Sequence, residues 1–377
     1  MQNIIILGAG FAALTAVREI RKQKLDVKIK LVAPTPVFEY LPSAIWVPFG
    51  LRTRESLAIP LDEFFKKNEV EYISARVSGL AVSENKVHTD QGEIAYDYLI
   101  VATGGRFIRK AKGINEHAII PCAGLEAADE FGKRLELIAS GTIAFGFSGN
   151  PKDPSAMRGG PIFEFLFGTD TYLKQQGIRD KFKLIFFSPA PEPGKRMGAK
   201  AVKRLLKRMW QLNIETYLGS KITEFAANKV STESTSFNTD LTLFIPGLTG
   251  PDWLDNSDLI RSAGGFIQAE STTLARGCKN VYVAGDSGSF PGPDWQPKQA
   301  HMADIQAACA VKNIKQQMEN LPDRYEFKVE LACIIDSLNS GVLVYRNQKF
   351  GFMFKSRLLH YAKRLFEWFY LRDLKSS

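Results

Sequence analysis

Short apolar runs separated by mixed polar segments recur along the chain, and their order predicts alternating strands and helices. The first run, "NIIIL", leads into a glycine-rich turn, a stretch with helical spacing of apolar residues, and a second apolar run, residues 27–32. Strand, turn, helix and strand in this order begin a βαβ unit. Further strand-like runs lie within residues 96–105, 142–147, 181–187 and 279–290. The pattern therefore predicts an α/β protein.

The turn after the first run, "LGAGFAA", has the spacing of a dinucleotide-binding fingerprint. Gly8 allows the tight turn, Gly10 lets the backbone approach a pyrophosphate, and Ala13 lets the helix pack close to the strand. The phosphates are expected at the helix amino terminus, where free N–H groups favour negative charge. No acidic residue follows near Ala33 to bind a ribose hydroxyl, and Glu39 in the next loop is a candidate substitute.

Two later stretches favour FAD over a mobile nicotinamide cofactor at this first site. Each is a buried strand that ends in glycine, which lets the strand end approach a ligand. One ends at Thr103 and Gly104, and the other ends at Gly285 and Asp286. We expect the carboxylate of Asp286 to accept a hydrogen bond from a ribityl hydroxyl.

Composition narrows the class of protein further. The chain has 377 residues, enough for two or three domains, and a net charge of +9, which favours an anionic partner. Because neither a leader sequence nor an apolar run of membrane-spanning length follows Met1, we expect a location on the cytoplasmic side. The four cysteines form no CxxC pair, which argues against a zinc site, and no metal is predicted. Pairing of distant cysteines in space stays open.

With these elements the chain resembles the two-dinucleotide-binding-domain flavoproteins, and within them the sulfide:quinone oxidoreductase and flavocytochrome c sulfide dehydrogenase group. "FEYLPSAIWVPFG" (residues 38–50) is similar to the group's loop beside the flavin, "DLTLFIPGLTG" (240–250) to its strand and Pro-rich turn, and "ACIIDSLNSGVLVY" to its closing hairpin. The resemblance covers the full length. It implies two Rossmann-like domains and a C-terminal amphipathic membrane-associating segment. The expected bounds are 1–110 with 246–320 for the FAD-binding domain, 111–245 for the donor-side domain and 321–377 for the C-terminal segment.

The resemblance also implies a monotopic membrane flavoenzyme, in which FAD takes two electrons from a small reduced donor and a quinone accepts them. In the sulfide enzymes two cysteines beside the flavin take up sulfide sulfur, often with a third. Cys122 matches the third, but the essential pair would stand near Arg158 and near Ser287 or Gly288, where this chain has no cysteine. Sulfide chemistry is therefore in doubt, because Arg and Ser cannot take up sulfane sulfur.

Residues 145–165 bear on the alternative donors. A type II-like NADH:quinone oxidoreductase needs a compact glycine turn here, but "NPKDPSAMR" separates Gly149 from Gly159. This activity stays an alternative, as does a catalytically retired flavoprotein that serves as a membrane scaffold or redox sensor. Arg158 is a candidate for binding an anionic donor.

The segment from Pro297 to Met318 is expected to be a helix with proline at its first position. If its amino terminus points at the flavin, the helix dipole and Lys298 would stabilise the anionic reduced form. The predicted catalytic residues are Lys298, Cys122 and Arg158. The predicted cofactor-binding residues are Gly8, Gly10, Phe11, Ala12, Ala13, Pro42, Ser43, Val77, Ala102, Thr103, Gly104, Gly285, Asp286 and Lys298.

The C-terminal segment concentrates positive charge, with ten Lys and Arg against five Asp and Glu in residues 324–377. In "FKSRLLHYAKRLFEWFYLRDLK" aromatic and basic residues surround an apolar stripe, which is typical of a helix lying in a bilayer interface. An apolar loop at 350–354 would dip with it, and quinone would enter there from the lipid. A helix packed on its own domain or in a homodimer is the alternative, and nucleic acid is disfavoured. The predicted quinone- and membrane-facing residues are Phe350, Phe352, Phe354, Leu365, Trp368 and Phe369.

Overall fold

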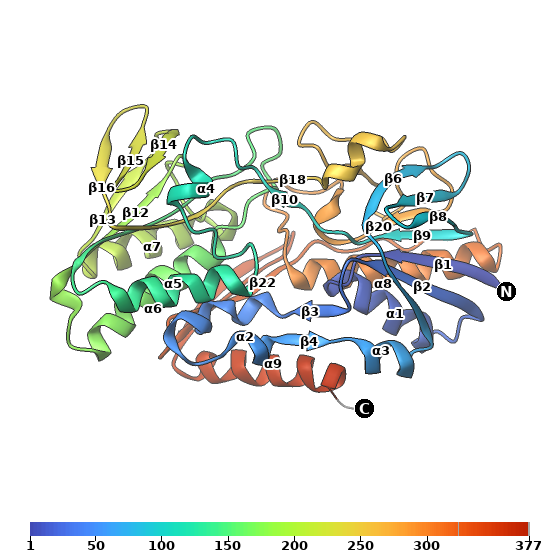
Figure 1. The fold of residues 1–377 in the computed structure, drawn as a ribbon, viewed down its shortest axis with the longest axis horizontal. Coiled ribbons are helices and arrows are strands. Elements are labelled where there is room, and N and C mark those ends of the chain that lie inside the picture. The colour runs from blue at the N-terminus through green and yellow to red at the C-terminus, as the bar shows by residue number, and fades with distance from the viewer. Residues whose placement is uncertain (323, 376–377) are drawn as a thin grey trace.

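The computed structural model describes residues 1–322 and 324–375, which form two parallel sheets, each in its own half of the molecule (Figure 1). The first sheet has the order β20-β9-β1-β2-β5. Its strands are β1 (Gln2–Leu7), β2 (Val27–Ala33), β5 (Val70–Ser74), β9 (Tyr98–Val101) and β20 (Val281–Val283). The predicted strands and the α/β class are confirmed.

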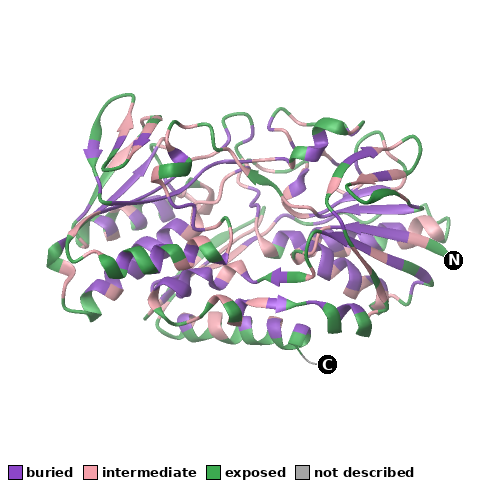
Figure 2. Ribbon diagram, in the orientation of Figure 1, coloured by how far each residue is buried: buried purple, intermediate pink, exposed green. Residues whose placement is uncertain are grey.

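The first sheet is buried on both faces, which explains the unbroken apolar run of β1 (Figure 2). Ile4 and Ile6 point to a core shared with α1 (Phe11–Lys22) and α8 (Ala300–Met318). Ile5 and Leu7 point to a second core under the antiparallel strands β6 (Val77–Ala81), β7 (Lys86–Thr89) and β8 (Gly92–Ala95). Since successive strand residues face opposite sides, each face of β1 receives two large side chains.

The second sheet repeats this arrangement, with the order β13-β12-β11-β17. Its strands are β11 (Gly141–Phe147), β12 (Phe182–Ser188), β13 (Ile214–Leu218) and β17 (Leu241–Ile245). The longer helices of this half are α5 (Leu125–Leu137), α6 (Gly160–Gln175) and α7 (Ala199–Gln211). On one face of this sheet, Ala144 of β11 packs in a core shared with three antiparallel strands. These strands are β14 (Ile222–Ala226), β15 (Lys229–Thr232) and β16 (Ser236–Asn238).

The chain passes between the two halves beside a short antiparallel pair, β10 (Arg106–Phe107) with β18 (Leu248–Thr249). The expected boundaries near residues 110 and 246 fall next to this pair, and the division into domains stays a prediction. The shorter elements are β3 (Val37–Glu39), α2 (Arg54–Leu57), β4 (Ala58–Pro60), α3 (Asp62–Lys67), α4 (Ile114–His117), β19 (Ile267–Gln268) and β21 (Gly288–Ser289).

The C-terminal unit is an antiparallel sheet followed by a helix along one edge of the molecule (Figure 1). It contains β22 (Leu331–Asp336), β23 (Gly341–Arg346), β24 (Gly351–Ser356) and α9 (Leu358–Lys375). The predicted hairpin and helix are confirmed. The loop expected at 350–354 is wrong, because residues 351–356 pair with β23 as the edge strand of this sheet.

A 3₁₀ segment, η1 (Leu41–Phe49), lies where the three parts of the molecule meet. On one side it packs against α5, where a side chain at Gly132 would come within 2.8 Å of the Pro48 backbone. On the other side the indole nitrogen of Trp46 donates to Asp336 of β22 at 3.1 Å. The position of η1 therefore depends on contacts from both directions.

Asp304 of α8 provides a test of the contact between α1 and α8. Burial raises the pKa of Asp304 to about 6, although Thr15 of α1 donates to its carboxylate at 2.6 Å. Because the folded state holds this proton more tightly than the unfolded state, stability falls as pH rises from about 4 to about 6. Asp304→Asn should remove this loss of stability. Between pH about 4 and about 6, its free energy of unfolding should therefore rise by about 1–2 kcal/mol relative to that of the wild type.

Denaturant unfolding of the flavin-free protein at the two pH values measures this difference. Asp258→Asn, at an exposed position, is the matched control and should track the wild type at both. Equal pH dependence of the Asp304→Asn protein and the wild type would show that Asp304 titrates as an ordinary carboxylate.

Candidate functional site

Three stretches that are distant in sequence meet at the carboxyl ends of β1, β9 and β20. Gly8 has φ +108°, and a Cβ atom there would lie 2.4 Å from the carbonyl oxygen of Ala102. Gly285 has φ +75°, and a Cβ atom there would lie 3.6 Å from that of Ala12. The structure thus brings together most of the residues predicted to bind the cofactor.

The amino terminus of α1 opens on this junction and suits a pyrophosphate. Gly10 precedes the helix, no side chain caps it, and its first turn contains no acidic residue. A Cβ atom at Gly10 would meet no atom within 4 Å, so a ligand can approach this backbone closely. Free N–H groups at such a terminus bind phosphate oxygens.

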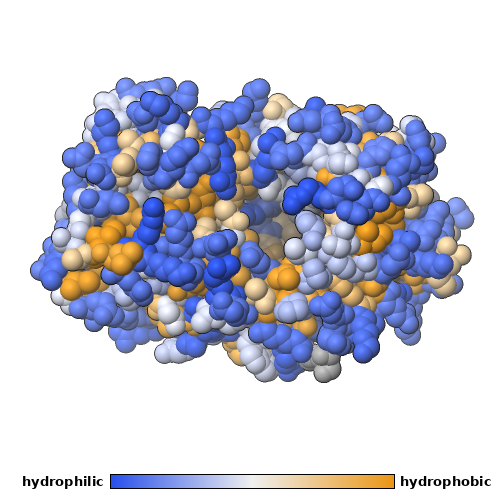
Figure 3. Space-filling model, in the orientation of Figure 1, coloured by the Kyte–Doolittle hydropathy of each residue, from blue (hydrophilic) through white to orange (hydrophobic). Residues whose placement is uncertain are grey.

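The surroundings of this junction are hollow. Figure 3 shows a recess near the centre of the face, between the two halves of the molecule. A small cavity that is partly open to solvent is lined by Gly285, Asp286 and Lys298, among others. In η1 the hydroxyl of Ser43 is buried without a hydrogen-bond partner among the described residues, and a polar ligand atom would satisfy it. These features fit FAD.

Other residues predicted to bind the cofactor are held in place by packing or by a hydrogen bond. Phe11 packs in an aromatic cluster with Tyr40 and with Tyr370 of α9, at ring-centroid distances of 5.8 and 5.3 Å. Val77 begins β6 and packs against the second core of the first half. The carboxylate of Glu39 accepts from the Leu125 N–H at 3.3 Å, at the start of α5.

Lys298 is not the exposed first-turn residue that a helix from Pro297 would give. The helix begins at Ala300 with Gln299 as its extended N-cap, so this part of the prediction is wrong. The ammonium of Lys298 donates to the carbonyls of Gly288 at 2.7 Å and Asp286 at 3.2 Å, which holds the residue outside the helix. Burial lowers its pKa to about 8.

Arg158 and Asp286 form an ion pair at the edge of the cavity. Arg158 comes from residues 148–159, which form an extended loop between β11 and α6 as the sequence predicts. Asn150 in this loop donates to the carbonyls of Leu248 and Gly264, at 2.9 and 3.0 Å. Asn150 therefore ties the loop to β18 and to the segment at Gly264.

Two cysteine thiols lie around one carboxylate, that of Glu164. Burial raises the pKa of Cys122 to about 12, although the charge of Arg158 opposes the shift, and the charge of Glu164 adds to it. Burial likewise raises the pKa of Cys333 in β22 to about 12, and Glu164 adds to it again. Sequence reasoning missed Cys333, since nothing in its neighbourhood along the chain connects it to Cys122. At Ser287, one of the positions where the resemblance implies a cysteine, the hydroxyl donates to Gly104 O at 3.0 Å.

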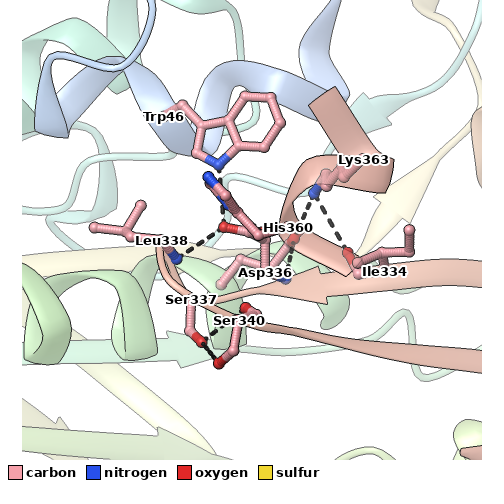
Figure 4. A network of polar contacts seen from close by, with 9 residues as sticks. Trp46, Ile334, Asp336, Ser337, Leu338, Ser340, His360 and Lys363 are labelled. Atoms are coloured by element: carbon pink, nitrogen blue, oxygen red, sulfur yellow. Dashed lines mark hydrogen bonds and ion pairs between the residues drawn. The ribbon is translucent and has the colours of Figure 1, made fainter. Parts of the chain in front are cut away.

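A buried polar network joins η1 to the C-terminal unit (Figure 4). Asp336 accepts from Trp46 and the Leu338 N–H and lies 2.8 Å from His360 Nδ1. Burial raises the pKa of Asp336, but hydrogen bonds from His360, Trp46 and Leu338 outweigh it, and the pKa lies below its usual value. Next to this carboxylate, Lys363 of α9 pairs with Glu164 at 2.5 Å. No pattern in the sequence predicts this network.

The fold and the site define a nucleotide-binding α/β oxidoreductase. Residues 2–307 match the pyridine nucleotide-disulphide oxidoreductase family, and the chain belongs to this family. Members of this family and sulfide:quinone reductases are FAD-binding flavoproteins. The family therefore confirms the prediction of FAD as the cofactor.

Individual relatives agree with the predicted resemblance. The chain is 26% identical over 359 residues to the sulfide-quinone reductase of Aquifex aeolicus, covering 89% of this chain and 81% of that protein. It is 24% identical over 339 residues to a type II NADH:quinone oxidoreductase of Staphylococcus aureus, covering 83% and 82%. The X-ray structure of the Aquifex aeolicus sulfide:quinone oxidoreductase shares the fold, with a TM-score of 0.90 at 24% identity over 100% of this chain and 92% of that chain.

Gly8 and Gly10 allow a test that separates folding from cofactor binding. Gly8→Ala should destabilise the flavin-free protein by more than about 2 kcal/mol, because the methyl group meets the Ala102 carbonyl at a positive φ. Gly10→Ala should cost about 1 kcal/mol or less, since the methyl group meets open space, yet weaken FAD binding strongly.

Unfolding midpoints and FAD titration of the flavin-free variants measure the two effects. The prediction fails if Gly10→Ala binds FAD as the wild type does.

Proposed function

We propose that this protein takes two electrons from a small reduced donor and passes them to a quinone at a membrane surface. One observation carries the proposal: the buried network of Asp336 connects η1, beside the FAD junction, to a helix with an exposed aromatic face. Bound FAD would supply the two-electron chemistry.

The exposed face of α9 supports contact with lipid. Most of its large apolar side chains point outward, whereas the opposite face is buried through His360, Glu367, Leu371 and Leu374. The guanidinium of Arg372 lies 4.9 Å from the Trp368 ring, which combines charge and aromatic surface as interfacial helices do. The exposed large apolar side chains of β24, its preceding turn and α9 are Phe350, Phe352, Phe354, Leu358, Tyr361, Leu365, Phe366, Trp368 and Phe369.

The same face would admit a quinone from the bilayer. In the described part of the chain no helix is both long and apolar enough to cross a membrane. An attachment through β24 and α9 is therefore peripheral, and the side of the membrane and any homodimer stay predictions.

The donor side favours a small molecule over NADH. The loop of residues 148–159 occupies the place where a compact glycine turn would hold a second pyrophosphate. Gly149 is also crowded, since a Cβ atom at Gly247 would lie 2.4 Å from its carbonyl carbon. These contacts leave little room for a nicotinamide cofactor in the second half.

The residues that face the donor side argue against thiolate chemistry in the resting protein. With a pKa of about 12, Cys122 stays protonated at neutral pH and is a poor nucleophile. Arg158 stands in an ion pair with Asp286 and offers a guanidinium to an anionic donor.

An anaerobic donor screen tests the proposed function. The flavin spectrum is followed while sulfide, NADH, NADPH or a small thiol is added, and a short-chain quinone is then supplied. At least one small donor should bleach the flavin faster than NADH does, and the quinone should restore the spectrum. Failure of every donor to support turnover would favour a retired flavoprotein.

Lys298 gives a prediction on the potential of the bound flavin. Its charge, present below pH about 8 and lost as pH rises through 8, should favour added electrons. Lys298→Met should lower the two-electron midpoint potential by on the order of 30 mV, equal to about 1.4 kcal/mol, at pH 7. The variant should also lose the inflection near pH 8.

Spectroelectrochemical titration across this pH range supplies both readouts. Lys315→Met, at a partly exposed position in the last turns of α8, should leave the potential and its pH profile unchanged. A wild-type inflection that survives in Lys298→Met would assign the effect to another group.

A further inference from the structure

The outer face of α7 is basic along its whole length. Its exposed cationic side chains are Lys200, Lys203, Arg204 and Lys207, and the helix contains no acidic residue. None of the four forms an ion pair within residues 1–322 and 324–375. Like charges at helical spacing repel one another, and an array of negative groups would remove that repulsion.

This face, the α7 basic face, adjoins the aromatic residues of the C-terminal unit. Arg204 donates to the carbonyl of Met353 in the edge strand β24 at 3.4 Å. On the same strand Phe352 and Phe354 are 48% and 56% exposed. Arg346 of β23 also donates to the carbonyl of Arg196, shortly before α7, at 2.7 Å. The basic and aromatic surfaces are therefore continuous.

An aromatic side chain also stands at the far end of α7. Trp210 is 77% exposed and follows the last of the four cations. Indole rings prefer the headgroup level of a bilayer, next to basic side chains that meet anionic lipid. The large apolar surface beside these cations favours a lipid surface over the polar groove of a nucleic-acid site.

We propose that the α7 basic face binds the headgroups of anionic phospholipids, as a second membrane contact beside β24 and α9. This rests on the proposed function, which brings the C-terminal unit to the bilayer. The contact adds a preference for anionic lipid and holds the second half of the molecule against the surface.

Vesicle partition of the FAD-loaded protein tests the proposal. The vesicles are phosphatidylcholine alone or phosphatidylcholine mixed with phosphatidylglycerol. The variant Lys200→Gln/Lys203→Gln/Lys207→Gln spares Arg204, which contacts β24. Its matched control, Lys110→Gln/Lys221→Gln/Lys229→Gln, removes three exposed lysines around β14 and β15.

The wild type and the control should bind the mixed vesicles more tightly than the neutral ones, and this gain should shrink with added salt. The α7 variant should lose on the order of tenfold or more of its affinity for mixed vesicles. Its binding to neutral vesicles, flavin content and reduction of a short-chain quinone should match the wild type.

The remaining outcomes separate the two proposals. If the α7 variant matches the wild type on mixed vesicles while Trp368→Ser/Phe369→Ser loses binding to both, the inference is overturned and the membrane proposal stands. If the wild type binds neither vesicle, both fail. Binding to RNA that depends on α7, with vesicle binding that does not, also overturns the inference.

A second readout covers the case in which the triple variant fails to fold. Brominated lipid in mixed vesicles should quench wild-type tryptophan fluorescence more than that of Trp210→Phe. Equal quenching would place Trp210 away from the bilayer and overturn the contact.

Discussion

The close approach of the Gly8 turn to the carbonyl of Ala102 is the constraint on which the site depends. It sets the ends of β1 and β9 side by side, and Gly285 closes the same junction from β20. Only glycine tolerates both the positive φ and the contact distance at position 8. The α1 amino terminus, the cavity at Asp286 and the ammonium of Lys298 all take their positions from this junction.

From this junction the structure extends in two chemically different directions. Towards the second half it meets partly buried cations and thiols, where Arg158 is paired with Asp286 and the thiols are protonated. Towards the C-terminal unit it meets η1 and the network of Asp336, with aromatic surface beyond. Separation of a polar side from a lipid-like side suits an enzyme whose two substrates differ in solubility.

The sequence predicted the elements that local patterns determine. Buried parallel strands are apolar on both faces, so "IIIL" and "YLIV" were recognisable, and the glycine spacing located the cofactor junction. Tertiary contacts decided the rest. The carbonyls of Asp286 and Gly288 hold Lys298 out of the helix that Pro297 indicated. Residues 351–356 lack the alternation of polar and apolar residues that predicts a strand. They form β24 because they pair with β23, and this strand exposes its aromatic rings. The proximity of Cys122 and Cys333 to Glu164 depends on the fold alone.

The position of η1 between α5 and the C-terminal unit has a consequence for tolerance to substitution. Gly132 lies far along the chain from every residue of the cofactor junction, yet any side chain there would press on the backbone at Pro48. The displacement would reach Ser43 and Trp46 in the same short segment. A deep mutational scan scored on quinone turnover would thus find an intolerant position in the middle of α5, far along the chain from the cofactor junction.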